Sequence, residues 1–150
     1  MIYHFIVKQI ITSNFKHLSN GNYTNVLATV SDAVVHEFLG SSAIGGRRQS
    51  KATLEQWFQR VFRLFPSFQF TVHDIIVNGW PWHTKVSVEW SAKVTPKEGP
   101  SYINTGVHII ILKWGKATKI SAYENSELVA TACQTMIQAG IEEAKASQIK

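Results

Sequence analysis

The feature that most constrains the fold is a long stretch in which apolar and polar residues alternate, from Phe68 to Asn125. Successive side chains of a β-strand point to opposite faces, so this alternation is typical of half-buried strands. Three groups of turn residues divide the stretch: Trp80-Pro81, "TPKEGP" and Gly115-Lys116. We therefore predict four consecutive strands joined by short turns, which form a strongly curved antiparallel meander. The strands are expected over 68–78, 82–94, 101–113 and 117–124.

Helical spacing marks segments on both sides of this meander. Residues 2–18 predict a first helix, and a short helical segment follows through Val26 and Leu27. The next helix carries a continuous apolar stripe, with Ser50 as its N-cap and Pro66 after its end. A last helix is predicted after the meander, capped by Ser126 and ending near Gly140.

One further strand is expected before the meander, over Asp32 to Leu39, where β-branched and aromatic residues gather. The following "GGRRQS" segment is predicted to be a loop. Helices placed in this order can cover only one face of the sheet. The sequence therefore predicts an α+β fold in which a cone-shaped, curved antiparallel sheet is covered by helices around an interior cavity. The length of 150 residues predicts a single domain over 1–150.

The composition limits the classes of partner that the protein is expected to bind. The net charge of +5 comes from scattered basic residues, so no nucleic acid is expected as a partner. No apolar run reaches 18 residues, and no membrane partner is expected. The single cysteine, Cys133, excludes an internal disulfide and is expected in the core of the last helix. With no basic leader or cleavage site at the N-terminus, these features favour the cytoplasm. The six histidines include no HExxH pattern, so no metal and no cofactor is expected.

The last predicted hairpin brings polar residues together. A two-residue loop at Gly115-Lys116 would place His108 opposite Tyr123 and Gly106 opposite Asn125. A slip of one residue would scatter this arrangement. The residues expected on the shared face are Tyr102, Asn104, His108, Tyr123 and Asn125.

The neighbouring hairpin adds an aromatic wall. Its expected register places Trp90 beside Gly106 and Val88 beside His108. Polar groups against an aromatic wall are typical of small-molecule pockets. The alternative is a solvated sheet face, or a purely structural role for His108.

Several segments, which together span nearly the whole chain, resemble the sequences of one protein family. They are "SDAVVHEFLGSSAIGGRRQS", "WFQRVFRLFPSFQFTV", "VNGWPWHTKVSVEW", "GPSYINTGVHIIIL" and "WGKATKISAYENSEL". The chain resembles the SnoaL-like polyketide cyclases, within the superfamily of nuclear transport factor 2 and ketosteroid isomerase. The resemblance implies a cone-shaped α+β barrel with a hydrophobic pocket for a small hydrophobic ligand. It also implies a homodimer packed through the sheet.

Enzymes of this superfamily are expected to hold a carboxylate in the pocket as general acid or base, without a metal. SnoaL-like chains commonly read Y-x-D before the last helix, whereas this chain reads Tyr123-Glu124-Asn125. An amide cannot serve as a base, and strand alternation directs Glu124 to the other face. The sequence therefore favours His108 as the acid/base group, with Asn125, Asn104 and Tyr123 polarising a carbonyl.

A second set of residues is expected to contact the ligand. Asp32 and His36, four residues apart on one strand, are also further acid/base candidates, although Asp32 could instead cap a turn and His36 could be structural. Trp57 belongs to the apolar stripe of its helix and could both pack in the core and line the cavity. The predicted ligand-binding residues are His36, Trp57, Trp90, Tyr102 and Asn104.

Two classes of function remain open. One is an enzyme that moves a proton on an apolar, carbonyl-bearing compound, as an isomerase, cyclase or dehydratase does. The other is a non-catalytic ligand-binding or dimeric interaction module that has lost the pocket aspartate. The aromatic "NGWPWHT" segment, 78–84, is interpreted as a proline-stiffened hairpin corner with Trp82 packing across strands, not as the site of chemistry.

Overall fold

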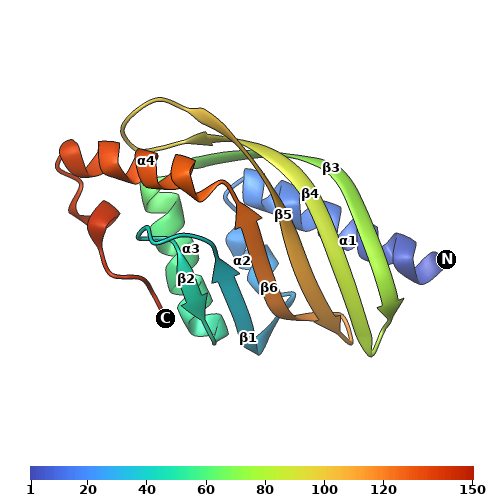
Figure 1. Ribbon diagram of the computed structural model, residues 1–150. Helices are drawn as coiled ribbons and strands as arrows, with labels where there is room; N and C mark the ends of the chain where they lie inside the picture. Colours follow the sequence, from blue (N-terminus) through green and yellow to red (C-terminus); the bar gives the residue numbers. More distant parts are fainter.

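The computed structural model describes residues 1–150, which form one six-stranded curved sheet with helices against it (Figure 1). The last four strands form the predicted antiparallel meander, while β1 lies parallel to β6. The order across the sheet is β2-β1-β6-β5-β4-β3. The strands are β1 (Val30–Phe38), β2 (Gly46–Arg48), β3 (Ser67–Trp80), β4 (His83–Thr95), β5 (Tyr102–Lys113) and β6 (Lys116–Glu124).

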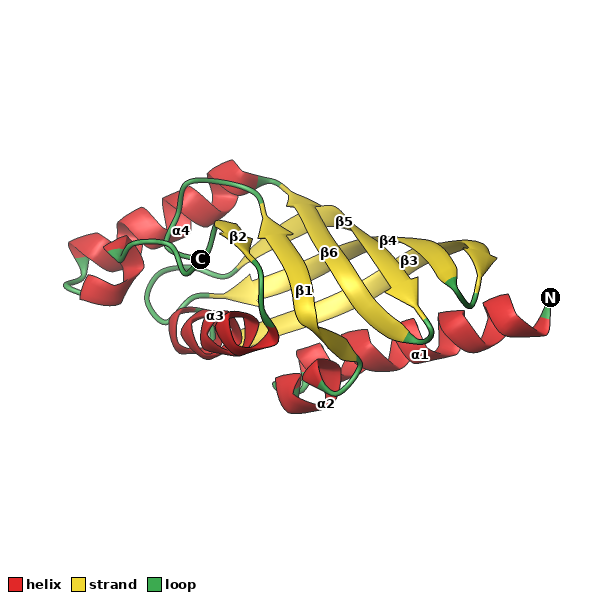
Figure 2. Cartoon of the chain, turned by 90° about the horizontal axis from the view of Figure 1, so that it is seen from below, coloured by secondary structure: helices red, strands yellow, loops and turns green.

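The helices give the sheet a covered, concave face. α1 lies along β3 at one edge and α3 lies beside β1 near the other (Figure 2). No helix is long and apolar enough to cross a membrane. The helices are α1 (Ile2–Ser19), α2 (Tyr23–Leu27), α3 (Lys51–Leu64) and α4 (Ser126–Gln138), followed by the short 3₁₀ helix η1 (Glu142–Lys145). The α+β class and the curved, helix-covered sheet are confirmed.

Local signals explain where the helices begin. The Ser50 side chain accepts a hydrogen bond from the Thr53 backbone N–H at 3.1 Å, which confirms the predicted cap of α3. For α4 the predicted cap, Ser126, is wrong by one residue. Asn125 is the N-cap, and its side-chain oxygen accepts from the Glu127 backbone N–H at 3.1 Å. Asn125 is thereby occupied in starting a helix.

The predicted loop "GGRRQS" contains a short edge strand. β2 pairs antiparallel with β1, and Arg48 lies opposite His36. The Arg48 side chain is fully buried, and it donates hydrogen bonds to the carbonyls of Gly45 at 2.8 Å and Ile149 at 3.1 Å. The strand was not predictable from this glycine-rich sequence, because pairing with β1 and one buried arginine stabilise it rather than β-propensity.

The turn between β5 and β6 also differs from the prediction. The two-residue loop is Trp114-Gly115, whose φ angles of 51° and 79° are those that a type I′ hairpin requires. A bulge then shifts the pairing between Ile111 and Leu112. The net result is a register one residue away from the predicted one, and such a slip exchanges the two faces of the strand.

The consequence of that slip lies at the far end of the hairpin. His108 pairs with Ala122 and Gly106 pairs with Glu124, in place of Tyr123 and Asn125. The β4–β5 register, by contrast, is confirmed, with Val88 opposite His108 and Trp90 opposite Gly106.

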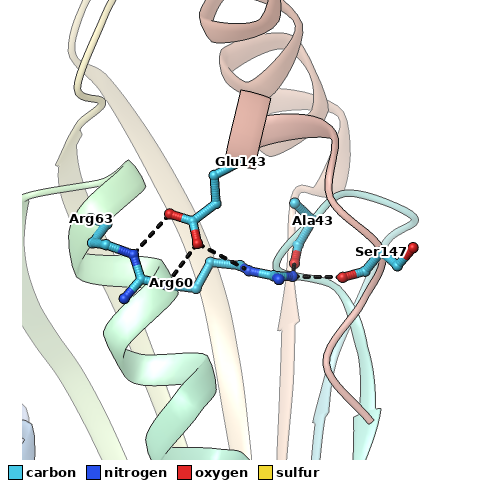
Figure 3. Close-up of polar contacts among 5 residues, drawn as sticks. All are labelled: Ala43, Arg60, Arg63, Glu143 and Ser147. Carbon is cyan, nitrogen blue, oxygen red and sulfur yellow. Dashed lines mark hydrogen bonds and ion pairs between the residues drawn. The ribbon is translucent and has the colours of Figure 1, made fainter. Parts of the chain in front are cut away.

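The C-terminal tail, residues 141–150, is held against α3 by charged contacts (Figure 3). Arg63 donates to both carboxylate oxygens of Glu143, at 2.8 and 2.6 Å. Arg60 donates to the carbonyls of Ala43 at 2.9 Å and Ser147 at 2.7 Å. These bonds join α3, the segment before β2 and the tail into one unit beside the buried Arg48.

Two smaller expectations are confirmed. Cys133 is a free, buried thiol on α4. The "NGWPWHT" segment forms the β3–β4 corner, where Trp80 and Trp82 stack with ring centroids 6.1 Å apart. Trp114, from the neighbouring turn, lies 6.4 Å from Trp82.

Candidate functional site

A cavity of about 180 Å³ lies between the concave face of the sheet, α1 and α3. One water molecule needs roughly 10–15 Å³ on the same measure, so the space is large enough for an organic molecule. Its walls are mostly apolar, with aromatic side chains predominating. The aromatic lining residues are Tyr3, Phe15, Phe38, Trp57, Phe58, Phe62, Phe68, Phe70, Trp90 and Tyr102.

The polar side chains of the cavity come from three adjacent strands. His36 lies on β1, Asn104 and His108 lie on β5, and Glu124 ends β6. Cross-strand neighbours on one face have Cβ atoms about 5 Å apart, and diagonal neighbours about 7–8 Å. Because Gly106 pairs with Glu124, both Asn104 and His108 are diagonal neighbours of that carboxyl group.

Glu124 provides the only carboxyl group that lines the cavity. Both of its oxygens are buried and neither has a hydrogen-bond partner. Burial raises the pKa of Glu124 to about 7, and the neighbouring Asn104 amide opposes part of that rise. The Asn104 nitrogen itself donates to the Asn125 carbonyl at 3.3 Å. Near neutral pH the carboxyl group can therefore both take up and release a proton.

Gly106 makes room for this arrangement. A β-carbon at this position would lie 2.7 Å from Cζ2 of Trp90 and 2.5 Å from the Tyr123 carbonyl oxygen. The indole of Trp90 occupies the space over the glycine and donates from Nε1 to Nδ1 of His108 at 2.7 Å.

That bond determines the state of His108. An indole nitrogen can only donate, so Nδ1 of His108 must be the unprotonated acceptor and Nε2 must carry the hydrogen. Burial lowers the pKa of His108 to about 4, and the ring therefore remains neutral at physiological pH. The Phe15 ring packs edge-on against it, with centroids 5.3 Å apart. His108 is consequently a hydrogen-bond donor and a poor base.

His36 is held in the same tautomer by a different partner. The guanidinium Nη1 of Arg48 donates to Nδ1 of His36, and a guanidinium cannot accept. Burial, then the charge of Arg48 and then His108, lower the pKa of His36 well below its usual value. The Trp57 ring packs against His36, with centroids 4.5 Å apart. His36 too has its hydrogen on Nε2.

Arg48 leaves an uncompensated positive charge behind His36. Burial, and then the charge of Arg60, lower the pKa of Arg48 to about 10, so the guanidinium remains protonated near neutral pH. None of the ion pairs in the structure includes Arg48. The polar part of the cavity therefore favours a ligand with a partly negative oxygen.

The predicted ligand-contacting residues lie together at the cavity. Trp57, Trp90 and Asn104 line it with His36, and the half-buried Tyr102 closes its end. Burial raises the pKa of the Tyr102 phenol, which therefore remains protonated.

The structure does not bring the remaining predicted site residues to the cavity. Tyr123 is 47% exposed on the outer face, because the register differs by one residue. Asn125 is exposed and caps α4. The Asp32 side chain is 99% exposed beside Lys51, at 3.7 Å, since an irregularity in β1 separates it from His36.

Sequence reasoning missed Glu124 and Arg48. No local signal marked Glu124, because the Trp114-Gly115 turn alone would keep the predicted face and only the bulge between Ile111 and Leu112 turns Glu124 inward. No local signal marked Arg48 either, because its role depends on burial by the C-terminal tail. The structure gathers no three His, Cys, Asp or Glu side chains that could hold a metal ion.

Fold and site together define a class: an α+β pocket protein in which a curved sheet and helices enclose an apolar cavity with a small polar end. A comparison with family models matches the SnoaL-like domain over residues 11–120. The chain therefore belongs to the SnoaL-like domain family. No curated protein sequence matches it.

Solved structures share the fold at low sequence identity. An NTF2-like protein of unknown function from Burkholderia pseudomallei is 14% identical, with a TM-score of 0.74, over 83% of this chain and 95% of that one. A protein from Novosphingobium aromaticivorans named for scytalone dehydratase is 12% identical, with a TM-score of 0.70 over 83% and 85%. A Pseudomonas putida protein named for polyketide cyclase is 17% identical, with a TM-score of 0.58 over 77% and 88%.

Proposed function

We propose that this protein transfers a proton on a small, apolar, carbonyl-bearing compound, as an isomerase, cyclase or dehydratase does, with Glu124 as the general base and acid. The observation that carries the proposal is the buried Glu124 carboxyl group, with no hydrogen-bond partner and a pKa of about 7. Membership of the SnoaL-like family and neighbours named for dehydratase and cyclase activities support the reaction class.

The proposed chemistry divides the roles between carboxylate and imidazoles. The ligand's carbonyl oxygen accepts hydrogen bonds from Nε2 of His108 and His36, which stabilise negative charge as it develops on that oxygen. The Glu124 carboxylate removes a proton from the carbon next to the carbonyl, and the electron pair of the broken C–H bond forms an enolate. Glu124 then returns its proton to another carbon, or to a leaving hydroxyl group. The base is therefore Glu124, in place of the expected His108.

The aromatic walls fit the non-reacting part of such a ligand. Phe15, Phe70 and Trp90 meet edge-to-face, with ring centroids 5.1 to 5.2 Å apart, and leave apolar surface toward the cavity. Apolar lining with a few placed polar groups is typical of sites that bind compact hydrophobic molecules.

The second candidate is a ligand-binding module without catalysis. The expectation that the pocket lacks a carboxyl group favoured this binding module. Glu124, however, lines the cavity with a carboxyl group. It remains an outcome of the test, since a cavity that only binds would have the same apolar walls.

The test uses hydrogen–deuterium exchange, because exchange reports proton transfer before a natural substrate is known. Apolar ketones and enones that raise the melting temperature are incubated with the protein in D₂O, and loss of the α-proton signal is followed by NMR. We expect exchange with wild type, and a loss of about 10²- to 10⁴-fold in Glu124→Gln. Glu89→Gln, on the outer face of β4, is the matched control. Bound ketones without exchange would support the binding module instead.

A further inference from the structure

The cavity reaches the surface at the end of the molecule where the β3–β4 and β5–β6 turns lie. Ile6 and Ile10 of α1 line it on one side, and Gly115 and Ala117 of the β5–β6 turn line it on the other. α1 makes its sheet contacts with β3, so the ends of β5 and β6 are left uncovered beside it (Figure 2).

The helix side of this mouth is an exposed apolar stripe. Ile2, Ile6 and Ile10 are four residues apart, so they share one side of α1, and they are 79%, 48% and 47% exposed. The orientation of α1 is held by His4, whose Nε2 donates to the Gly79 carbonyl at 2.8 Å.

Three tryptophans continue the apolar surface across the turns. Trp80, Trp82 and Trp114 are 49%, 57% and 72% exposed, and they pack against one another. The Trp114 backbone N–H donates to the Pro81 carbonyl at 2.6 Å, which ties the two turns together. Large exposed apolar patches on soluble proteins mark sites of interaction, and tryptophan is enriched where proteins meet a bilayer surface.

The charges around this patch are positive apart from Asp32 of β1, which pairs with Lys51 at 3.7 Å. The three segments that build this end, 1–31, 75–88 and 107–123, contain no aspartate or glutamate. The exposed lysines on them near the turns and the N-terminal half of α1 are Lys8, Lys85, Lys113, Lys116 and Lys119.

The Ile2–Ile6–Ile10 stripe, the three tryptophans and these lysines together form what we call the docking surface. We propose that the docking surface binds an anionic lipid bilayer, so that apolar ligands pass directly between the bilayer and the cavity. Tryptophan and isoleucine side chains insert at the headgroup level, while each lysine near an anionic surface adds electrostatic attraction. Such peripheral docking needs no membrane-spanning helix. It revises the expectation that the protein has no membrane partner.

Charge favours a bilayer over a second copy of the chain. A two-fold interface would place this surface against itself, and its lysines would then face lysines with no carboxylate between them. An anionic headgroup layer supplies the missing negative charge.

Vesicle flotation tests the proposal with the full chain. We expect binding to vesicles of one part phosphatidylglycerol to two parts phosphatidylcholine, with a blue shift of tryptophan fluorescence, and weak binding to pure phosphatidylcholine. Lys113→Glu/Lys116→Glu should lower the partition coefficient by about tenfold or more, because two attractive charges become repulsive. Trp82→Ala/Trp114→Ala should lower it as well. Lys113→Arg/Lys116→Arg, which retains the charge, should bind as wild type does.

The controls separate docking from general charge and from folding. Lys97→Glu/Lys150→Glu changes the net charge equally, away from the two turns, and should bind as wild type does. Melting curves establish that each variant is folded. The proposal is overturned if wild type binds vesicles with and without phosphatidylglycerol equally. It is overturned as well if Lys113→Glu/Lys116→Glu and Lys97→Glu/Lys150→Glu lose binding to the same extent. It is also overturned if Trp82→Ala/Trp114→Ala converts a dimer to monomers in light scattering, since a second copy then covers the surface.

Discussion

Glu124 owes its chemistry to its surroundings rather than to its residue type. The exposed Glu89 on the same sheet faces solvent, whereas both Glu124 oxygens are buried without a partner. His36 and His108 show the converse effect, since burial keeps both rings neutral, and the N–H donors of Arg48 and Trp90 fix the ring hydrogen on Nε2. The residue types were visible in the sequence, but the protonation states depend on burial and on contacts between strands.

The raised pKa of Glu124 predicts a dependence of stability on pH. The folded protein holds the proton to about pH 7, while the unfolded chain releases it near pH 4.5, so folding stability from this group is lost as pH rises between those values. Denaturant melts from pH 4.5 to 8 should show Glu124→Gln gaining stability over wild type as pH rises. Glu89→Gln should run parallel to wild type, and a parallel Glu124→Gln curve would contradict the assignment.

Trp90 is predicted to position His108. Trp90→Phe removes the only donor to Nδ1, so we expect ¹⁵N NMR to show His108 change from one tautomer to a mixture, with its pKa remaining low because the ring is still buried. Exchange of ketone α-protons should fall while ligand binding changes less. Trp82→Phe, on the exposed corner, should leave the His108 signals unchanged. An unaltered tautomer in Trp90→Phe would show that the indole does not select it.

At the scale of the element, the β5–β6 hairpin decides which residues enter the cavity. The Trp114-Gly115 turn and the bulge after it shift the register by one residue, and this parity places Glu124 inside and Tyr123 outside. The strand itself was predictable from its alternation, because a period of two is a local property. Which residues of β6 face the cavity was not predictable in the same way, because one bulge exchanges the two faces of the strand without altering the alternation of apolar and polar residues.

Gly106 is predicted to be sensitive to the smallest side chain. Gly106→Ala would place a β-carbon 2.7 Å from the Trp90 ring and 2.5 Å from the Tyr123 carbonyl oxygen, so either the indole or the strand must move. We expect a loss of about 1–3 kcal/mol in the free energy of unfolding, together with altered His108 signals in NMR. Thr105→Ala, on the opposite face of β5, should change neither. Equal stability of Gly106→Ala and wild type would show that the indole can yield freely.

At the scale of the whole molecule, the sheet has two different faces. The helices cover the concave face (Figure 1), which holds the cavity, while the outer face of β5 and β6 carries the exposed Ile103 and Tyr123. The fold class and the meander were predictable, since helix stripes, caps and turn residues act locally. The edge strand β2 and the buried Arg48 were not, because contacts distant in sequence stabilise them.

The outer face is expected to form a homodimer, as the family resemblance implies. Light scattering should then give about twice the chain mass of 16.9 kDa. Ile103→Lys/Tyr123→Lys should yield monomers, because opposed lysines would be buried without partners at a two-fold contact. Glu55→Lys, exposed on α3, should remain dimeric. A monomeric wild type would contradict the expectation and leave the outer face to another role.

The sequence alone determined the helices, the four-stranded meander and the buried cysteine. These features follow from periodicity and turn chemistry, which neighbouring residues impose on one another. Only the tertiary structure decided which residue of Tyr123-Glu124-Asn125 faces the cavity, and that Arg48 and Trp90 hold two histidines as neutral donors. The physical reason is that strand parity and burial arise between segments far apart in the chain, so one bulge in the β5–β6 hairpin decides whether the Glu124 carboxyl group faces the cavity.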